Sequence, residues 1–263
     1  MKTKSSIKYQ LSDMKRPVAI FYFIMFCILV LGFTVFKLNN VGVGSSVIIS
    51  SSSISGTGFT GMEAGSAIFL FVCGLNSFKE FFRMLTQNGL SRKTIYTGRI
   101  ITFLAVCAGM VVIDKIILVV GKLITSYFPG THFVGLFELI YAGRADQAGA
   151  VQMHIDGFLF NFCLYLALIT IGYFITIAFY RMNKIAKISV GIGVPMILLY
   201  GVSFLDTFLF HGVIGNTLLN TLSFAFGFKN GANPYFGMVT CLLIFGIFAG
   251  LSWLTMRKAV VKD

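Results

Sequence analysis

The chain alternates between long apolar runs and shorter polar segments, and this pattern predicts helices that cross a membrane. An apolar helix of about 20 residues spans the roughly 30 Å hydrocarbon core of a bilayer. The predicted spans cover residues 17–36, 62–77, 100–123, 157–180, 188–210 and 234–256. The second run is short for a full crossing, and Pro195 predicts a bend in the fifth.

Residues 1–16 mix basic and apolar positions ahead of the first run. Ile7, Leu11 and Met14 recur at helical spacing among lysines. This pattern is typical of an amphipathic helix that lies on the inner membrane surface and binds anionic lipid. A frayed basic tail is the alternative that the spacing leaves open.

A basic segment, residues 78–99, separates the second and third runs. Apolar side chains recur at i, i+3, i+4 and i+7, which predicts an amphipathic helix over about 78–90. These positions are Phe78, Phe81, Phe82 and Leu85. Asn88 and Gly89 are typical of a helix end, and Ser91 is placed to cap the next helix. Spacing alone leaves two interpretations: a helix that contacts a partner, or a solvated loop.

Two further segments are too apolar for ordinary loops. We expect residues 133–141 to form a short interfacial helix. Residues 211–233 are apolar but repeatedly interrupted by Gly and Asn. We interpret the second segment as a re-entrant hairpin before the sixth span, because irregular backbone at membrane depth must be covered by protein.

Composition and charge support an all-α integral membrane protein. The chain is 57% hydrophobic and only 11% charged, whereas soluble domains have roughly 25% charged residues. The net charge of +12 does not indicate nucleic acid, because sixteen of the 21 Lys and Arg residues lie near one proposed face. Basic residues collect on the cytoplasmic side of membrane proteins. We therefore predict six spans with both termini cytoplasmic, in one membrane domain covering residues 1–263.

The motifs exclude several kinds of chemistry. No GxxxxGK[ST] motif occurs, so the chain has no P-loop of its own and we expect it not to be an enzyme. The three histidines lack metal-site spacing, and we expect no metal or other cofactor on this chain. The five cysteines lie in apolar runs, where we interpret them as small buried residues. Two GxxxG patterns, at Gly61 and Gly246, are explained by chance among 28 glycines.

Ionisable residues inside predicted spans are the strongest candidate site. Asp114, Lys115 and Asp206 fall in such runs, where a charge is costly and usually faces the bundle interior or water. We weigh structural pairing, with Lys115 and Asp206 as one possible pair, against a substrate pathway and proton coupling. Glu63 and Asp156 lie at span ends, where we expect them to sit in interfacial water.

Together, these features resemble the permease subunits of ABC-2-type exporters from Firmicutes. The basic start, the six-span layout and the apolar segment before the last span contribute, and the stretch NGLSRKTIYTGR is the most specific. The small size and the lack of an attached ATPase look closest to exporters of amphipathic peptides, such as phenol-soluble modulin or antimicrobial peptide exporters. The overlap in motif covers only about twenty residues.

The resemblance implies a dimer in the bacterial plasma membrane, formed with a second copy or a sister permease. Each permease would dock on a separate ATPase that binds ATP and Mg, and the cargo would be an amphipathic peptide or hydrophobic substrate. The ATPase-coupling residues would be Phe78, Phe81, Phe82, Arg83, Leu85, Asn88, Gly89, Ser91 and Arg92. The alternatives are an ion- or proton-coupled carrier without an ATPase and a non-transporting sensor or immunity protein. Cargo, direction and dimer type stay open.

Overall fold

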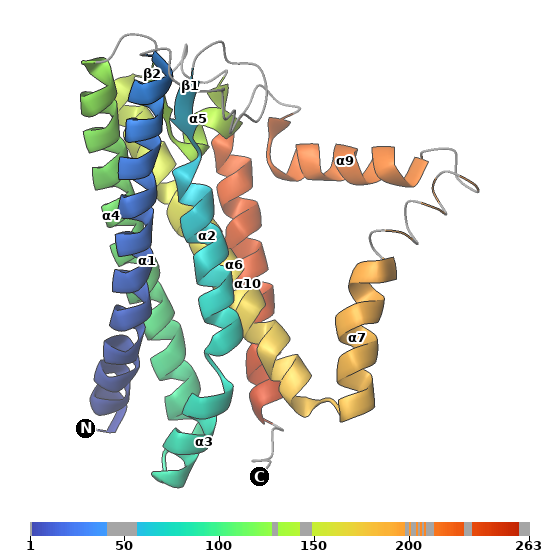
Figure 1. Cartoon of the computed structure of the whole chain (residues 1–263). Helices are drawn as coiled ribbons and strands as arrows, with labels where there is room; N and C mark the ends of the chain where they lie inside the picture. The colour runs from blue at the N-terminus through green and yellow to red at the C-terminus, as the bar shows by residue number, and fades with distance from the viewer. Residues whose placement is uncertain are drawn as a thin grey trace. The chain divides into compact units, whose positions relative to one another are not determined.

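The computed structural model (Figure 1) describes residues 2–40, 57–127, 131–142, 149–197, 200, 204, 206, 208, 213–228 and 233–257. The described chain is almost entirely helical. It forms two compact units. Unit 1 comprises Met1–Phe69 and Lys93–Ile140, and unit 2 comprises Leu70–Arg92 and Tyr141–Asp263. Each unit joins non-consecutive parts of the chain, and the prediction of a single domain stays a prediction.

Unit 1 is built on two long helices, α1 (Lys2–Asn40) and α4 (Arg92–Ser126), together with the first part of α2 (Met62–Asn76). Two short strands, β1 (Thr57–Thr60) and β2 (Thr131–Val134), pair in parallel with Thr57 opposite Thr131. Of the short helix predicted at 133–141, the structure contains α5 (Leu136–Ile140), while residues 133 and 134 belong to β2; an interfacial position for this helix stays a prediction.

Helix α1 runs without a break from the basic N-terminal segment into the predicted first span. Pro17 lies inside it. A proline has no N–H, so the carbonyl four residues earlier, that of Asp13, loses its helical donor. The predicted surface helix is therefore helical, but it is continuous with the first span instead of being a separate element.

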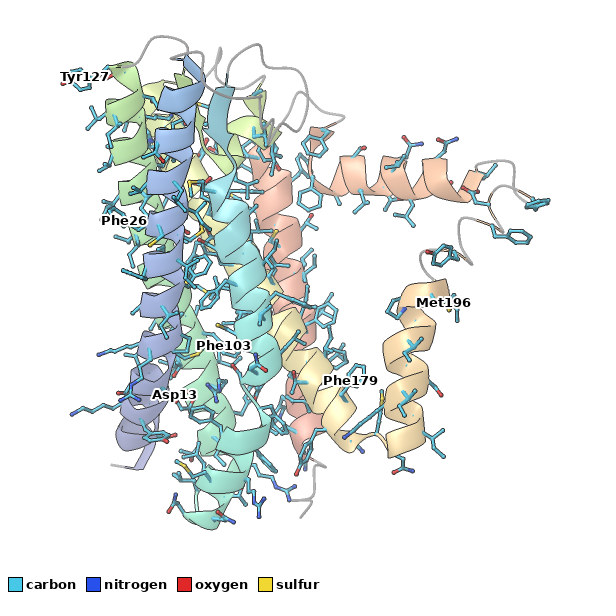
Figure 2. The ribbon with its side chains drawn as sticks, in the orientation of Figure 1. Asp13, Phe26, Phe103, Tyr127, Phe179 and Met196 are labelled. Atoms are coloured by element: carbon cyan, nitrogen blue, oxygen red, sulfur yellow. The ribbon has the colours of Figure 1, made fainter. Side chains whose placement is uncertain are left out.

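Four helices are long and apolar enough to cross a membrane: Ser6–Gly32, Arg92–Ser126, Val151–Arg181 and Pro234–Arg257. They overlap the spans predicted at 17–36, 100–123, 157–180 and 234–256 but differ from them in their bounds, and the spans themselves stay predictions. Many of their apolar side chains face outward, such as Phe26, which is 63% exposed (Figure 2). The count of six spans is not confirmed, because α2 and Ile185–Met196 are apolar but shorter. At 1.5 Å per residue, α2 covers only about 22 Å.

Unit 2 is organised around α6 (Ala150–Arg181) and α10 (Pro234–Arg257), which lie side by side and run in the same direction (Figure 1). Near their starts, the Tyr235 hydroxyl donates to Asp156 at 3.3 Å. Near their ends, the Tyr173 hydroxyl lies 3.8 Å from the Met256 sulfur. The unit also contains α3 (Lys79–Gln87), α7 (Lys184–Met196) and α9 (Val213–Ala225).

The end of α2 crosses α6 in backbone contact. A Cβ atom on Gly74 would lie 2.3 Å from the Ile169 carbonyl oxygen, and one on Gly172 would lie 2.4 Å from that of Phe71. The Thr176 hydroxyl donates to the Leu75 carbonyl at 2.5 Å. Only glycine allows two helix backbones to approach this closely. The GxxxG glycines noted above are not the close contacts: added Cβ atoms on Gly246 and Gly250 would meet nothing within 4 Å.

The region before α10 is only partly described. Helix α7 ends at Met196, one residue after Pro195. Residues 198–199, 201–203, 205, 207 and 209–210 of the fifth predicted span lie outside the described residues, and the full span stays a prediction. The predicted re-entrant hairpin contains one described helix, α9, followed by a turn at Gly227 with φ of 76°. Its second arm and its place in a membrane stay predictions.

Candidate functional site

The buried polar cluster of unit 1 is the candidate site, and Asp114 of α4 lies within it. Asp114 is 6% exposed. Its Oδ1 atom accepts hydrogen bonds from the hydroxyls of Tyr22, at 2.9 Å, and Ser66, at 3.1 Å. Tyr22 belongs to α1 and Ser66 to α2, so one carboxylate oxygen joins three helices. Two hydroxyl donors supply part of the stabilisation that a buried carboxylate loses when it leaves water.

Lys115, the next residue on α4, pairs with Glu63 of α2. The Lys115 Nζ atom lies 3.6 Å from Glu63 Oε1, with side chains 17% and 4% exposed. Asp206 belongs to unit 2, and its suggested pairing with Lys115 stays a prediction. Within unit 2, Asp206 accepts a hydrogen bond at 2.8 Å from the N–H of Gly215, in the first turn of α9, where a carboxylate satisfies an otherwise unbonded helix donor.

The expectation that Glu63 and Asp156 sit in interfacial water is wrong. Each residue is only 3% exposed. Glu63 accepts a hydrogen bond from the N–H of Leu136 at the start of α5, and Asp156 accepts one from Tyr235. Position at the end of an apolar run suggested hydration, but neighbouring segments of the same unit cover both carboxylates.

A second ion pair lies on the same side of α4. Lys122 pairs with Glu138 of α5, whose other oxygen accepts a hydrogen bond from the N–H of Gly135 at 3.4 Å. Helix α4 therefore carries two lysines, about two turns apart, that meet carboxylates of α2 and α5. These contacts attach β2 and α5 to the long helices of unit 1.

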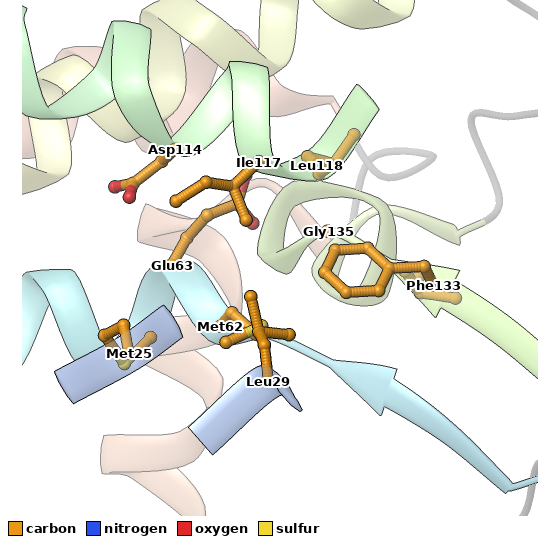
Figure 3. A pocket seen from close by; sticks show the side chains of 10 residues that line it. Met25, Leu29, Met62, Glu63, Asp114, Ile117, Leu118, Phe133 and Gly135 are labelled. Carbon is orange, nitrogen blue, oxygen red and sulfur yellow. The ribbon is translucent and has the colours of Figure 1, made fainter. Parts of the chain in front are cut away.

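Glu63 and Asp114 also line a small cavity (Figure 3). Its volume is about 20 Å³, which is room for about one water molecule. Apart from the two carboxylates the lining is apolar: Met25, Leu29, Met62, Ile117, Leu118, Phe133, Val134 and Gly135. The cavity is too small for a peptide or an organic substrate. What this arrangement offers chemically is a place for a proton or a water beside two carboxylates and one ammonium group.

The predicted coupling helix is α3, and it lies in unit 2. Phe78 and Phe82, 2% and 1% exposed, stack with ring centroids 4.9 Å apart. Both rings pack edge-on against Tyr180 of α6, at 5.3 and 6.2 Å, and Phe78 also meets Tyr173 at 6.0 Å. Leu85 is 4% exposed and Phe81 is half-buried. The chain itself thus covers most of the apolar face.

The opposite edge of α3 and the corner after it are exposed. The exposed residues are Arg83, Met84, Gln87, Asn88, Gly89, Ser91 and Arg92. The corner has the predicted form, since Gly89 has φ of 69° and α4 begins at Arg92. Arg92 donates to the carbonyl of Arg257 at 2.6 Å, where a cation stabilises the C-terminal end of α10. The capping role of Ser91 stays a prediction.

Tyr141, the first residue of the segment Tyr141–Asp263 of unit 2, contacts the turn before α10. Its hydroxyl donates to the Phe226 carbonyl at 2.9 Å, and its ring meets Phe160 of α6 edge-on. Burial, and to a smaller extent the neighbouring Cys241, raises the pKa of Tyr141 to about 12. The phenol therefore stays protonated and remains a donor well above neutral pH.

Fold and site together define a broad class. A nearly all-helical chain with four long apolar helices is compatible with a multi-pass membrane protein. In comparisons with protein-family models, with curated proteins and with solved structures, nothing matches this chain.

Sequence reasoning found Asp114 and Lys115 but missed their partners. Tyr22 and Ser66 lie in apolar runs, and no local sequence pattern indicates that their hydroxyls donate hydrogen bonds to a carboxylate. Glu63 carried a usable signal, because an ionisable residue within an apolar helix commonly faces the protein interior and pairs there. Among the described residues, no group of three His, Cys, Asp or Glu side chains is placed to hold a metal ion.

Proposed function

We propose that this chain is the transmembrane subunit of an ATP-driven exporter, and that α3 receives the movement of a separate ATPase. The observation that carries the proposal is the two-sided character of α3. Its apolar face is buried against α6 by Phe78 and Phe82, while its polar edge is exposed. A short amphipathic helix built this way suits the transfer of force from a partner to a long helix.

The contacts that attach α3 to the rest of unit 2 determine which helices move when a partner displaces α3. Phe78 contacts both Tyr173 and Tyr180, so a displacement of α3 moves the C-terminal third of α6 with it. Arg92 connects the following corner to the end of α10. Motion applied at α3 therefore reaches α6 and α10, which pack along one another. Rigid-body movement of packed helices is a common route of domain closure.

The roles of the coupling residues divide into two sets on this proposal. Phe78, Phe82 and Leu85 hold the helix to its own chain and act as positioning residues. Arg83, Asn88 and the corner at Gly89 are the surface that a partner meets. This division differs from the expectation that Phe78, Phe82 and Leu85 are themselves ATPase-coupling residues.

The remaining parts of the proposal follow from the family resemblance. The ATPase subunit binds ATP and Mg, and this chain assembles with a second copy or a sister permease in a bacterial plasma membrane. The cargo is an amphipathic peptide or another hydrophobic substrate, which moves outward by alternating access. The cavity of unit 1 is far too small for such cargo, so the transport path lies elsewhere.

Charge reversal on α3 tests the proposal. The full chain is co-expressed with the protein of a neighbouring reading frame that carries a Walker A motif, and co-purification and ATPase rate are measured. We expect Arg83→Glu to abolish co-purification while the chain still elutes as a folded species. Lys187→Glu, an equally exposed site on α7, is the matched control and leaves assembly unchanged. Full assembly and transport with Arg83→Glu would exclude α3 as the coupling element.

A second candidate, an ion- or proton-coupled carrier that acts alone, is favoured by the buried Asp114, Lys115 and Glu63 cluster. Charged groups within apolar helices commonly mark ion or proton pathways. On this alternative, the purified chain in liposomes accumulates a peptide in response to a pH gradient without ATP. Asp114→Asn abolishes that transport, whereas it leaves ATP-driven export with a partner measurable.

A further inference from the structure

An open groove runs along α1 in unit 1 and has a charged end and an apolar body. Its volume is about 540 Å³. Asp13 and Arg16 form the charged end, and the residues of the body are Pro17, Ile20, Phe21, Ile24 and Phe69. Asp13 lies on α1 near the N-terminus (Figure 2). We propose that this groove binds one anionic phospholipid, with its phosphate on Arg16 and an acyl chain along the apolar body.

An aromatic stack forms part of the apolar body of the groove. The rings of Phe21 on α1 and Phe69 on α2 stack with centroids 4.3 Å apart and planes 17° from parallel. Ile20 and Ile24, 60% and 51% exposed, continue along one side of α1. The two isoleucines are four residues apart, so they lie one above the other on the helix. Such an apolar surface suits an alkyl chain, whose flexibility allows it to follow the shape of the groove.

The charged end favours an anionic headgroup with donors. Arg16 offers a guanidinium, whose forked donors match phosphate oxygens. Asp13 offers a carboxylate. Its main-chain carbonyl also has no helical N–H donor, because the residue four positions later is Pro17. These oxygens accept hydrogen bonds from headgroup hydroxyls such as those of a glycerol. Exposed Lys8 and Lys15 give the same stretch of α1 an excess of positive charge, which selects against a headgroup of zero net charge.

The position along α1 agrees with a lipid and not with a soluble ligand. Both charged residues precede the most apolar part of α1, and the groove continues into it. A phospholipid has the same order of groups, with a charged head followed by hydrocarbon. The proposal is independent of the exporter function, because any protein that inserts α1 in a bilayer would present the groove.

Native mass spectrometry of the full chain in an uncharged detergent tests the proposal. The probes are dioleoyl phosphatidylglycerol, which is anionic, and the net-neutral dioleoyl phosphatidylethanolamine and phosphatidylcholine. We expect one phosphatidylglycerol to remain bound at low lipid excess, with weaker binding of the ethanolamine lipid and the weakest of the choline lipid. Equal retention of all three, or preference for a neutral lipid, would overturn the proposal.

Two matched pairs of variants locate the site. Arg16→Gln should weaken phosphatidylglycerol binding about fivefold, since a cation near the surface contributes about 1 kcal/mol toward anionic lipid. Lys15→Gln removes the same charge from an exposed position outside the groove and should weaken binding less than Arg16→Gln, because it leaves the forked donors of Arg16 on the phosphate. Ile24→Trp fills the groove and should also lower retention, while Phe23→Trp, at a 68% exposed site outside it, should not. Equal losses within either pair would refute a site at this groove, as would binding of an amphipathic peptide there without lipid.

Discussion

Removing the Glu63 carboxylate tests whether the buried charges of unit 1 act as a connected pair. Glu63 offers one oxygen to Lys115 and the other to the N–H of Leu136. Glu63→Ala deletes both contacts, whereas Glu63→Gln keeps an acceptor for Leu136 and removes only the charge. Lys115→Met removes the ammonium group and keeps a long apolar side chain in its place.

The expected losses follow from burial. Leaving one partner of a fully buried ion pair costs about 3–5 kcal/mol. The distance of 3.6 Å and the 17% exposure of Lys115 place this pair below that range, at about 2–3 kcal/mol. Glu63→Ala also leaves the Leu136 donor without its acceptor, which adds about 1–2 kcal/mol. The double variant Glu63→Gln with Lys115→Met has no unpaired charge, and we expect it to lose less than either charge-breaking change alone.

The measurement is the free energy of unfolding of the purified chain in mixed micelles, with denaturing detergent as the variable and helical circular dichroism as the signal. A double-mutant cycle over Glu63→Gln and Lys115→Met gives the coupling energy, which we expect to be at least 1 kcal/mol. Additive effects within about 0.5 kcal/mol would show that the two groups do not stabilise each other. The pairing described for unit 1 would then be wrong as an energetic statement.

Three further changes test unit 2. Phe82→Ala removes a ring that is 1% exposed and should lower the unfolding free energy by about 3–4 kcal/mol. The control Phe81→Ala removes a half-buried ring and should lower the unfolding free energy by less than half of that amount. Equal losses would contradict the packing of α3 on α6. Gly74→Ala places a methyl group 2.3 Å from a carbonyl oxygen and should lower the melting temperature. Gly246 has open space around it, so Gly246→Ala should leave the melting temperature unchanged or raise it slightly. An unchanged melting temperature for Gly74→Ala would mean that the helices do not cross there. Because the pKa of Tyr141 is raised from about 10 to about 12, its share of stability is complete below pH 10 and is lost as the pH rises toward 12. Tyr141→Phe should remove that part of the alkaline loss in a pH series of melting temperatures, and an unchanged slope would speak against a buried phenol.

Much of the helical layout was predictable, because apolar length and helix-end signals are local. The four long apolar helices overlap four of the apolar runs, and the corner at Gly89 has the expected positive φ. The periodicity of α3 also identified its apolar face correctly. It did not identify the residues that cover that face. The spacing of Phe78 and Phe82 predicts that the face is buried, but not which surface it packs against. Tyr180, about a hundred positions later, provides that surface.

The contacts between distant segments were beyond local patterns. Lys115 was expected to meet an acid, but the choice of Glu63 depends on how α2 and α4 align in space. The tight crossing at Gly74 and Gly172 was missed for a related reason. Neither glycine belongs to a GxxxG pattern. That pattern requires two glycines four residues apart on one helix, whereas here one glycine on each of two helices makes the contact.

The order in which the polar cluster of unit 1 is synthesised bears on how α4 enters a membrane. Asp114 and Lys115 each raise the cost of inserting an isolated helix by about 2.5–3.5 kcal/mol. Their partners Tyr22, Ser66 and Glu63 all come earlier in the chain. During translation these groups are already in place when α4 leaves the ribosome, so the nascent chain itself can receive the two charges. The cluster then acts as an insertion aid, and variants lacking Glu63 would deliver less α4 to the bilayer before any folded protein exists to be destabilised.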